Sequence, residues 1–200
     1  MGTAVSTVPF ASDRWLYEGV TLEGDDLSGQ ALDRVEVYES TLKRVTLCEA
    51  TLRRWVFEEC RFVDCDLSMA MLDQCVLQSV EFEGCKLVGV DWTRPSKSSL
   101  SVSFERCSLR LGNLAGVRLR ETKLLECDLR ECDFTGADCT GADLRRSNLT
   151  GALLGGASLQ KADLRETRGL DLDPEMRFKG ARVSTEVALK LAERMGLRLD

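Results

Sequence analysis

Histidine is absent from the 200-residue chain. Its absence excludes His-based acid/base catalysis, Ser/His and Cys/His nucleophile pairs and His-ligated zinc. Aromatic residues make up only 6% of the sequence, and there are only 3 prolines. No apolar run reaches the roughly 18 residues of a transmembrane helix. The N-terminus lacks a basic segment followed by a long apolar run, so we expect no secretory signal, no membrane contact and a cytoplasmic location.

The charge balance limits the choice of partner. Acidic side chains number 33 and basic side chains 27, which gives a formal net charge of −6. A protein that binds nucleic acid directly by neutralising phosphates is normally basic, so we expect no direct nucleic-acid binding. Apolar residues make up 44% of the chain, which is enough to bury a core.

Large apolar residues recur at every fifth position. The period is unbroken over 15 positions from Leu22 to Trp92, and it resumes at Phe104 for 13 more positions that end at Leu164. Two residues before most of these centres stands a small residue, which is Val, Ala or Cys in 7 cases each. The remaining three positions of each repeat are mostly polar or Gly.

Neither a helix, with a period of about 3.6, nor a strand, with a period of 2, explains a period of five. Five residues can form one short side with two inward residues, followed by a tight corner. Gly at the corner, as in Thr135-Gly136, permits positive φ. Four sides close a coil of twenty residues, and stacked coils share backbone hydrogen bonds at about 4.8 Å per coil.

This pattern resembles the pentapeptide-repeat family over residues 20–166. The resemblance implies an all-β fold, a right-handed quadrilateral β-helix. The 28 centres, at four per coil, give about seven coils and a length of about 34 Å. We expect residues 1–19 to form an N-terminal cap and residues 167–200 a C-terminal cap.

The nine cysteines follow the same pattern. Seven occupy the small inward position, Cys139 occupies the large one, and Cys48 alone points outward. Buried free cysteine packs as a small hydrophobe, so we expect core packing rather than a metal or redox role. No metal and no cofactor are expected, and the enzyme class is disfavoured because outward carboxylates on convex faces form no pocket.

The repeat breaks between Trp92 and Phe104, where twelve residues stand in place of ten. Residues 93–103 are either a tolerated bulge or a functional loop on a rigid scaffold, and a cis bond at Pro95 is one way to kink the chain. The candidate partner-binding residues of this loop are Arg94, Pro95, Ser96, Lys97, Ser98, Ser99, Leu100 and Ser101.

The C-terminal segment contains a candidate helix. Ser184 can cap a helix from Thr185 to Met195 with Gly196 as its terminator. The order GLDLDP, KGARVS and then a helix with a Gly-hydrophobic-x-hydrophobic tail resembles the topoisomerase-protecting branch of the family. That branch includes the Qnr quinolone-resistance proteins and the albicidin- and microcin B17-resistance proteins. In these relatives the tail forms a two-fold dimer interface, which implies a homodimer here through Val187, Leu191, Met195, Leu197 and Leu199.

The resemblance implies that the chain binds DNA gyrase, or topoisomerase IV, and protects it from a poison. A rigid acidic rod can occupy the groove that holds DNA, and two rods joined end to end span about 70 Å, or about 20 base pairs. The candidate acidic residues are Glu36, Glu39, Glu58 and Glu59 on one face and Asp64, Glu81 and Glu83 on a neighbouring face. The alternative is a non-enzymatic interaction scaffold without a topoisomerase role.

Overall fold

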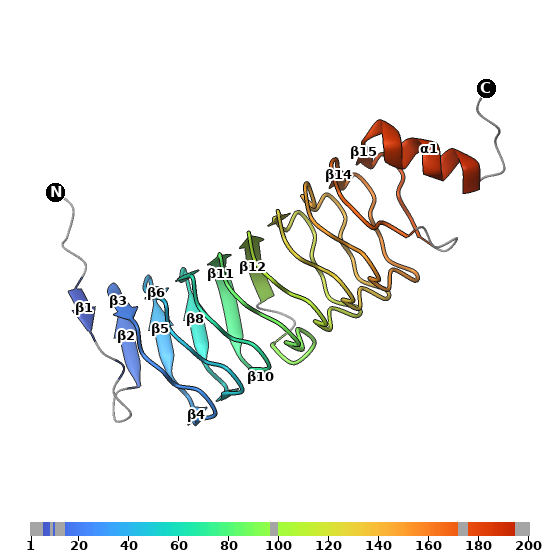
Figure 1. The fold of residues 1–200 in the computed structure, drawn as a ribbon. Coiled ribbons are helices and arrows are strands. Elements are labelled where there is room, and N and C mark those ends of the chain that lie inside the picture. The colour runs from blue at the N-terminus through green and yellow to red at the C-terminus, as the bar shows by residue number, and fades with distance from the viewer. Residues whose placement is uncertain (1–5, 9, 11–14, 97–99, 172–175, 195–200) are drawn as a thin grey trace.

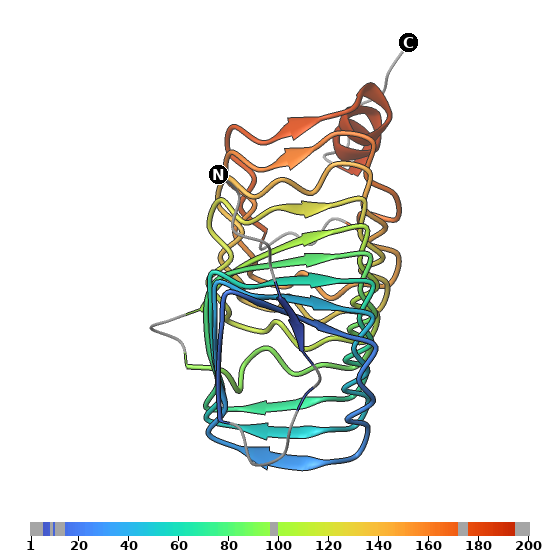
Figure 2. The same ribbon diagram turned by 90° about the vertical axis from the view of Figure 1, so that its left-hand side faces the viewer.

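The computed structural model describes residues 6–8, 10, 15–96, 100–171 and 176–194. The chain winds into an elongated parallel β-solenoid with one short helix at its C-terminal end (Figure 1). The end-on view shows successive coils stacked with their flat sides in register (Figure 2). No helix among the described residues is long and apolar enough to span a membrane.

A register of twenty residues defines four faces. On face A, Thr21 pairs with Thr41 and Thr41 with Arg61, and on face D, Glu36 pairs with Val56 and Val56 with Val76. Face B is built of isolated bridges such as Asp26 to Thr46, and face C of short strands and bridges. All of these pairings are parallel, so each side chain lies above its counterpart in the previous coil.

The strands are short because a corner follows every third or fourth residue. Face A contains β1 (Ser6–Val8), β3 (Val20–Glu23), β6 (Thr41–Lys43), β9 (Arg61–Val63), β12 (Leu100–Glu105, which begins on face D), β13 (Leu124–Leu125), β14 (Asp163–Leu164) and β15 (Arg182–Val183). Face D contains β2 (Leu16–Glu18), β5 (Glu36–Tyr38) and β8 (Val56–Glu58), and face C contains β4 (Ala31–Asp33), β7 (Thr51–Arg53) and β10 (Met71–Asp73). Strand β11 (Val76–Glu83) turns the corner from face D to face A.

The inward positions form one continuous core. Of the 28 centres, all are buried except Leu32, which is half-buried at the first coil of face C. The Val, Ala and Cys residues of the small position are all buried, and so is Cys139, while Cys48 is half-exposed. The expected fold class and the inward assignment of the cysteines are therefore confirmed.

Every regular corner uses the left-handed backbone region, and most corners are not glycine. Eighteen non-glycine residues have φ between 46° and 61°, each two positions after an inward centre. Such a residue costs about 1–2 kcal/mol relative to right-handed backbone. The corner N–H reaches a carbonyl of the next coil, as in Glu121 N to Thr140 O at 2.9 Å. This hydrogen bond repeats at most corners and offsets the strain.

The break in the repeat is confined to a few residues. Arg94 is the one described corner residue after a centre that lacks positive φ, yet Ser96 still donates its N–H to Cys75 O at 2.8 Å, and the bond before Pro95 is trans. The chain rejoins the stack where Leu100 pairs with Leu77, and a bulge follows before Val102 pairs with Val80. After the bulge, paired residues are 22 positions apart rather than 20, which is the net excess of two residues expected from the sequence.

Both ends of the solenoid extend beyond the periodic sequence. Phe10 stacks on Tyr17 and Trp55 with ring centroids 5.5 and 5.9 Å apart, and β1 pairs with β3. At the other end, β15 pairs with β14, and α1 (Thr185–Arg194) follows. The solenoid therefore has about eight turns rather than the seven expected, because Tyr17 and the β15 coil add to the stack.

Candidate partner-binding surfaces

Face D carries an acidic patch over its first three coils, consisting of Glu18, Glu36, Glu39, Glu58 and Glu59. Within the described residues no Lys or Arg forms an ion pair with any of the five. Tyr38 lies among them and donates its hydroxyl to Glu36 Oε2 at 3.2 Å. Burial, together with the carboxylates of Glu36 and Glu58, raises the pKa of Tyr38. Four of the sequence-predicted acidic residues are thus brought together, and the sequence analysis missed Glu18.

The C-terminal half of face D has the opposite charge. Its outward side chains include the basic residues Arg118, Arg120, Lys161, Arg177 and Lys179, which outnumber the acidic residues Glu121 and Asp138. Arg120 pairs with Asp138 at 3.1 Å. Face D is therefore polarised along the solenoid axis, and most of its acidic side chains without an ion pair in the described residues lie over the N-terminal coils.

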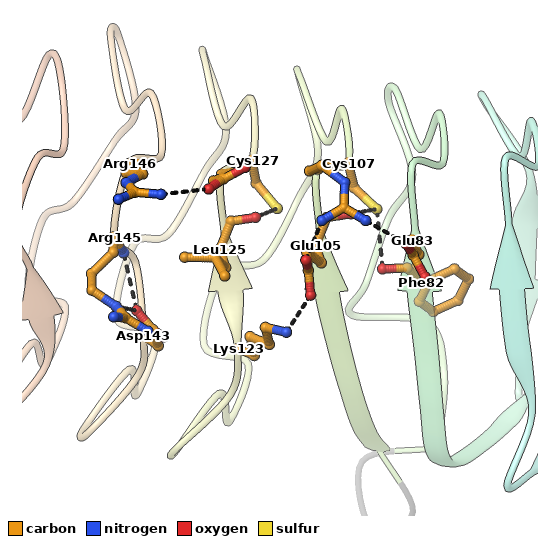
Figure 3. Close-up of polar contacts among 12 residues, drawn as sticks. Phe82, Glu83, Glu105, Cys107, Lys123, Leu125, Cys127, Asp143, Arg145 and Arg146 are labelled. Atoms are coloured by element: carbon orange, nitrogen blue, oxygen red, sulfur yellow. Dashed lines mark hydrogen bonds and ion pairs between the residues drawn. The ribbon is translucent and has the colours of Figure 1, made fainter.

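Face A carries both signs of charge, interleaved along the axis (Figure 3). Glu83 pairs with Arg61 and with Arg106, and Glu105 pairs with Arg106 and Lys123. The hydrogen bond from Lys123, assisted by Arg106, lowers the pKa of Glu105. Further along, Arg146 bridges Glu126 at 3.0 Å and Glu166 at 3.2 Å, and Arg145 pairs with Asp143 at 2.6 Å.

This ion-pair ladder reduces the negative charge that the second group of predicted acidic residues contributes to the surface. Asp64 and Glu81 are exposed on face A or its corner without an ion pair in the described part of the chain, but Glu83 is held between two arginines. Because its charge is compensated, Glu83 contributes little to an anionic surface. Opposite charges about twenty residues apart in the sequence, such as Arg61 and Glu83, were the signal that could have revealed these pairs.

The loop residues divide into an anchored group and a group that lies partly outside the described residues. Arg94 pairs with Asp73 at 2.7 Å and with Asp91 at 3.3 Å, and Pro95 is buried in the inward position of face D. Arg94 to Ser96 therefore hold the coil together. Lys97, Ser98 and Ser99 lie outside the described residues. Leu100 is half-buried, and Ser101 is exposed.

The predicted dimer residues lie in or after α1. Ala188 donates its N–H to Ser184 O at 3.0 Å, so Ser184 stands at the start of the helix as expected. Val187 is buried against its own chain, with 7% of its surface exposed. The side chain of Leu191 and all of Met195, Leu197 and Leu199 lie outside what the structure describes.

The outer surface offers no evident catalytic or metal centre in the described ranges. No group of three or more Cys, Asp or Glu side chains there is arranged to hold a metal ion. A cavity of about 60 Å³ lies at the C-terminal end of the core, and its walls are apolar, formed by residues such as Leu164, Met176 and Phe178. What the molecule presents is a set of flat, chemically distinct faces of the kind that bind macromolecules.

Comparison with known proteins agrees with the repetitive β-solenoid architecture described above. The profile of the pentapeptide-repeat family matches in eight copies over residues 40–78, 113–151 and 147–168, and this chain belongs to the pentapeptide-repeat proteins. No curated protein sequence matches. Similar solved structures include a trypsin-treated form of QnrB1, a plasmid-mediated fluoroquinolone resistance protein (20% identity, 98% of both chains, TM-score 0.63). Full-length QnrB1 is also similar (21% identity, 98% of this chain and 100% of that chain, TM-score 0.56).

A second protein with a similar structure has a different biological role. HetL, a pentapeptide-repeat protein involved in heterocyst differentiation regulation in the cyanobacterium Nostoc sp. Strain PCC 7120, is 20% identical over 84% of both chains, with a TM-score of 0.53. At these identities the likeness concerns the fold, and the function must be argued from the faces.

Proposed function

We propose that this protein binds a type II topoisomerase, with DNA gyrase as the first candidate and topoisomerase IV as the second, and protects it from a poison. The observation that carries the proposal is the acidic patch of face D, whose five glutamates lack ion-pair partners in the described residues. The fold shared with a fluoroquinolone resistance protein, QnrB1, supports it. The proposed partner acts in the cytoplasm, and the proposal places this protein there.

The charge density of the patch suits a groove that holds DNA. Glu36 and Glu39 lie on one coil and Glu58 and Glu59 on the next, which is two carboxylates per coil of about 4.8 Å. Duplex DNA carries one charge per about 1.7 Å of its axis. The patch therefore approaches the linear charge density of DNA, whereas the ion pairs of face A and the basic half of face D do not. Mimicry, on this proposal, is the property of a short patch rather than of the whole rod.

The loop and the C-terminal segment have separate roles in the proposal. Because Arg94 to Ser96 hold the coil, the part of the loop available for contact with the topoisomerase begins after Ser96. We propose that this contact helps to dislodge the drug. We also propose that the C-terminal segment joins two chains, with Val187 fixing α1 on its own protomer.

A scaffold without a topoisomerase role is the second candidate, and the similarity to HetL favours it. The two candidates differ in a measurable way. A topoisomerase-protecting protein must change the activity of purified gyrase, whereas a scaffold for other partners leaves that activity unchanged. Neither candidate is an enzyme.

The test of the acidic patch uses two matched variants. Glu59 and Glu121 both occupy left-handed corners of face D, with φ of 54° and 58°, but only Glu59 lies in the acidic patch. We expect Glu59→Lys to weaken binding to gyrase at low salt by about 1 kcal/mol, or roughly fivefold. Glu121→Lys should bind like the unmodified protein. Equal affinities for the two variants would remove the acidic patch from the binding surface.

The test of the loop keeps the coil intact. Replacing residues 97–99 by a short Gly/Ser connection leaves Arg94 with its two carboxylate partners and the pairing of Leu100 with Leu77 in place. We expect this variant to bind gyrase but to lose protection against the poison. Full protection by the variant against every poison tested would show that the loop is only a bulge.

A further inference from the structure

Exposed large apolar side chains gather on face C and on its edge with face B. In the described ranges eight such residues are exposed, and they are Trp15, Leu16, Met69, Met71, Leu111, Leu153, Phe178 and Leu189. Four of the eight lie toward the two ends of the chain. The other four, Met69, Met71, Leu111 and Leu153, lie along face C and its edge. Single exposed apolar residues are normal, but an aligned set marks an interaction surface.

The first part of this surface is a shallow depression. Met69 and Leu111 are 57% and 54% exposed, and Gly89 lies between them on the same corner line. A Cβ atom on Gly89 would lie 2.3 Å from Met69 Sδ, so the thioether lies directly over the glycine. The depression has a volume of about 410 Å³ and extends past Met71 to Arg94. Methionine adapts to the shape of a partner, which suits such a site.

The second part is flat and carries little charge. Its outward residues over the later coils are small, and they include Ala115, Gly116, Thr135, Gly136 and Gly155. A Cβ atom added at Gly116, Gly136 or Gly155 would meet no atom within 4 Å. Leu153 projects from this plane with 59% of its surface exposed. A flat partner can therefore approach the backbone of face C closely.

The charges around this surface select the kind of partner. Arg94 is held by Asp73 and Asp91, while Glu49 and Asp133 form no ion pair within the described residues. The border of the surface is thus weakly acidic around an apolar centre. Phosphates would be repelled by it. A protein surface whose apolar side chains are bordered by Lys or Arg is complementary, and a groove that holds DNA carries such cations.

We propose that face C, from Met69 to Leu153, is the surface by which this protein docks on the body of the topoisomerase, through apolar contacts bordered by Lys and Arg of the enzyme. This inference rests on the proposed function. It adds a contact that DNA itself cannot make. The acidic patch of face D supplies attraction that salt screens, and face C supplies contact that salt does not screen.

The test introduces a charge on face C without disturbing the core. Leu111→Arg and Leu153→Arg change exposed side chains, and Gly155→Arg changes a glycine whose φ is not left-handed and whose Cβ would meet nothing. The matched control is Leu125→Arg, which changes an outward leucine on face A. Binding to purified gyrase is measured by biolayer interferometry at low and high salt, and circular dichroism checks each fold.

We expect each face C variant to lose about tenfold or more in affinity at both salt concentrations, as for residues near the centre of an interface, while the control keeps its affinity. Face C variants that bind like the unmodified protein would overturn this docking surface and leave the proposed function standing. No binding by the unmodified protein would overturn both. A change of oligomeric state in light scattering, with gyrase affinity kept, would assign face C to contact between copies and also overturn the proposal.

Discussion

Two buried tryptophans provide a sharp test of how the break in the repeat affects stability. Trp55 and Trp92 are each 1% exposed, but only one of them satisfies its indole N–H. Trp55 Nε1 donates to Leu32 O at 3.1 Å, whereas Trp92 Nε1, on the last centre before the break, is buried without a partner in the part of the chain that the structure describes. The substitutions Trp55→Phe and Trp92→Phe remove the same atoms from two equally buried positions, of which Trp55 is a small inward position and Trp92 a large centre. Their difference therefore isolates the hydrogen bond.

The expected magnitudes follow from that difference. Loss of the indole volume costs each variant about 1–2 kcal/mol. Trp92→Phe also removes an unsatisfied buried donor that costs about 1–3 kcal/mol, so its net effect should be close to zero. Trp55→Phe loses a hydrogen bond worth about 1 kcal/mol in addition to the volume. We expect Trp55→Phe to be the less stable of the two by about 2 kcal/mol in urea unfolding. An equal or larger loss for Trp92→Phe would refute the assignment of an unsatisfied donor at the break.

Three further predictions concern the coils. Leu129→Asp buries a charge at a fully enclosed position and should cost several kcal/mol, while Arg130→Ala should cost less than about 1 kcal/mol; equal thermal shifts would contradict the inward assignment. Gly136→Ala should cost about 1 kcal/mol from backbone strain alone, and Gly169→Ala much more, because its Cβ would lie 2.5 Å from backbone atoms of the neighbouring coil; equal melting temperatures would contradict this. Cys48 should be the cysteine that iodoacetamide labels in the native protein, and rapid labelling of most of the others would refute their burial.

The fold was predictable because the inward residues can be identified from the five-residue period alone. A small residue and a large one, two apart, specify a side, and stacking every twenty residues needs no further information. The corners were less predictable. Glycines such as Gly136 indicate positive φ. Arg34 and Met69 adopt the same conformation, but the type of their side chains does not predict it. Their conformation is imposed by the coil-to-coil hydrogen bond, which exists only after the solenoid has closed.

The outer surface was predictable only in part. The clustering of Glu36 and Glu58 follows from the offset of twenty residues, and the structure places them on one face. The compensation of Glu83 does not follow from composition, because its partners Arg61 and Arg106 lie on opposite sides along the axis and the break shifts the second offset. The apolar line on face C was also missed, because Met69 and Leu111 stand at corner positions that the repeat assigns to polar residues.

The central claim is tested most directly by a gyrase supercoiling assay with the purified protein. Relaxed plasmid, gyrase and ATP are combined with increasing amounts of the protein, with and without a quinolone, albicidin or microcin B17. We expect the protein to reduce poison-induced cleavage and to restore supercoiling in the presence of at least one poison, and Glu59→Lys to require a higher concentration than Glu121→Lys for the same effect. Supercoiling and cleavage that stay unchanged at every concentration, with each poison and without one, would contradict the proposed function.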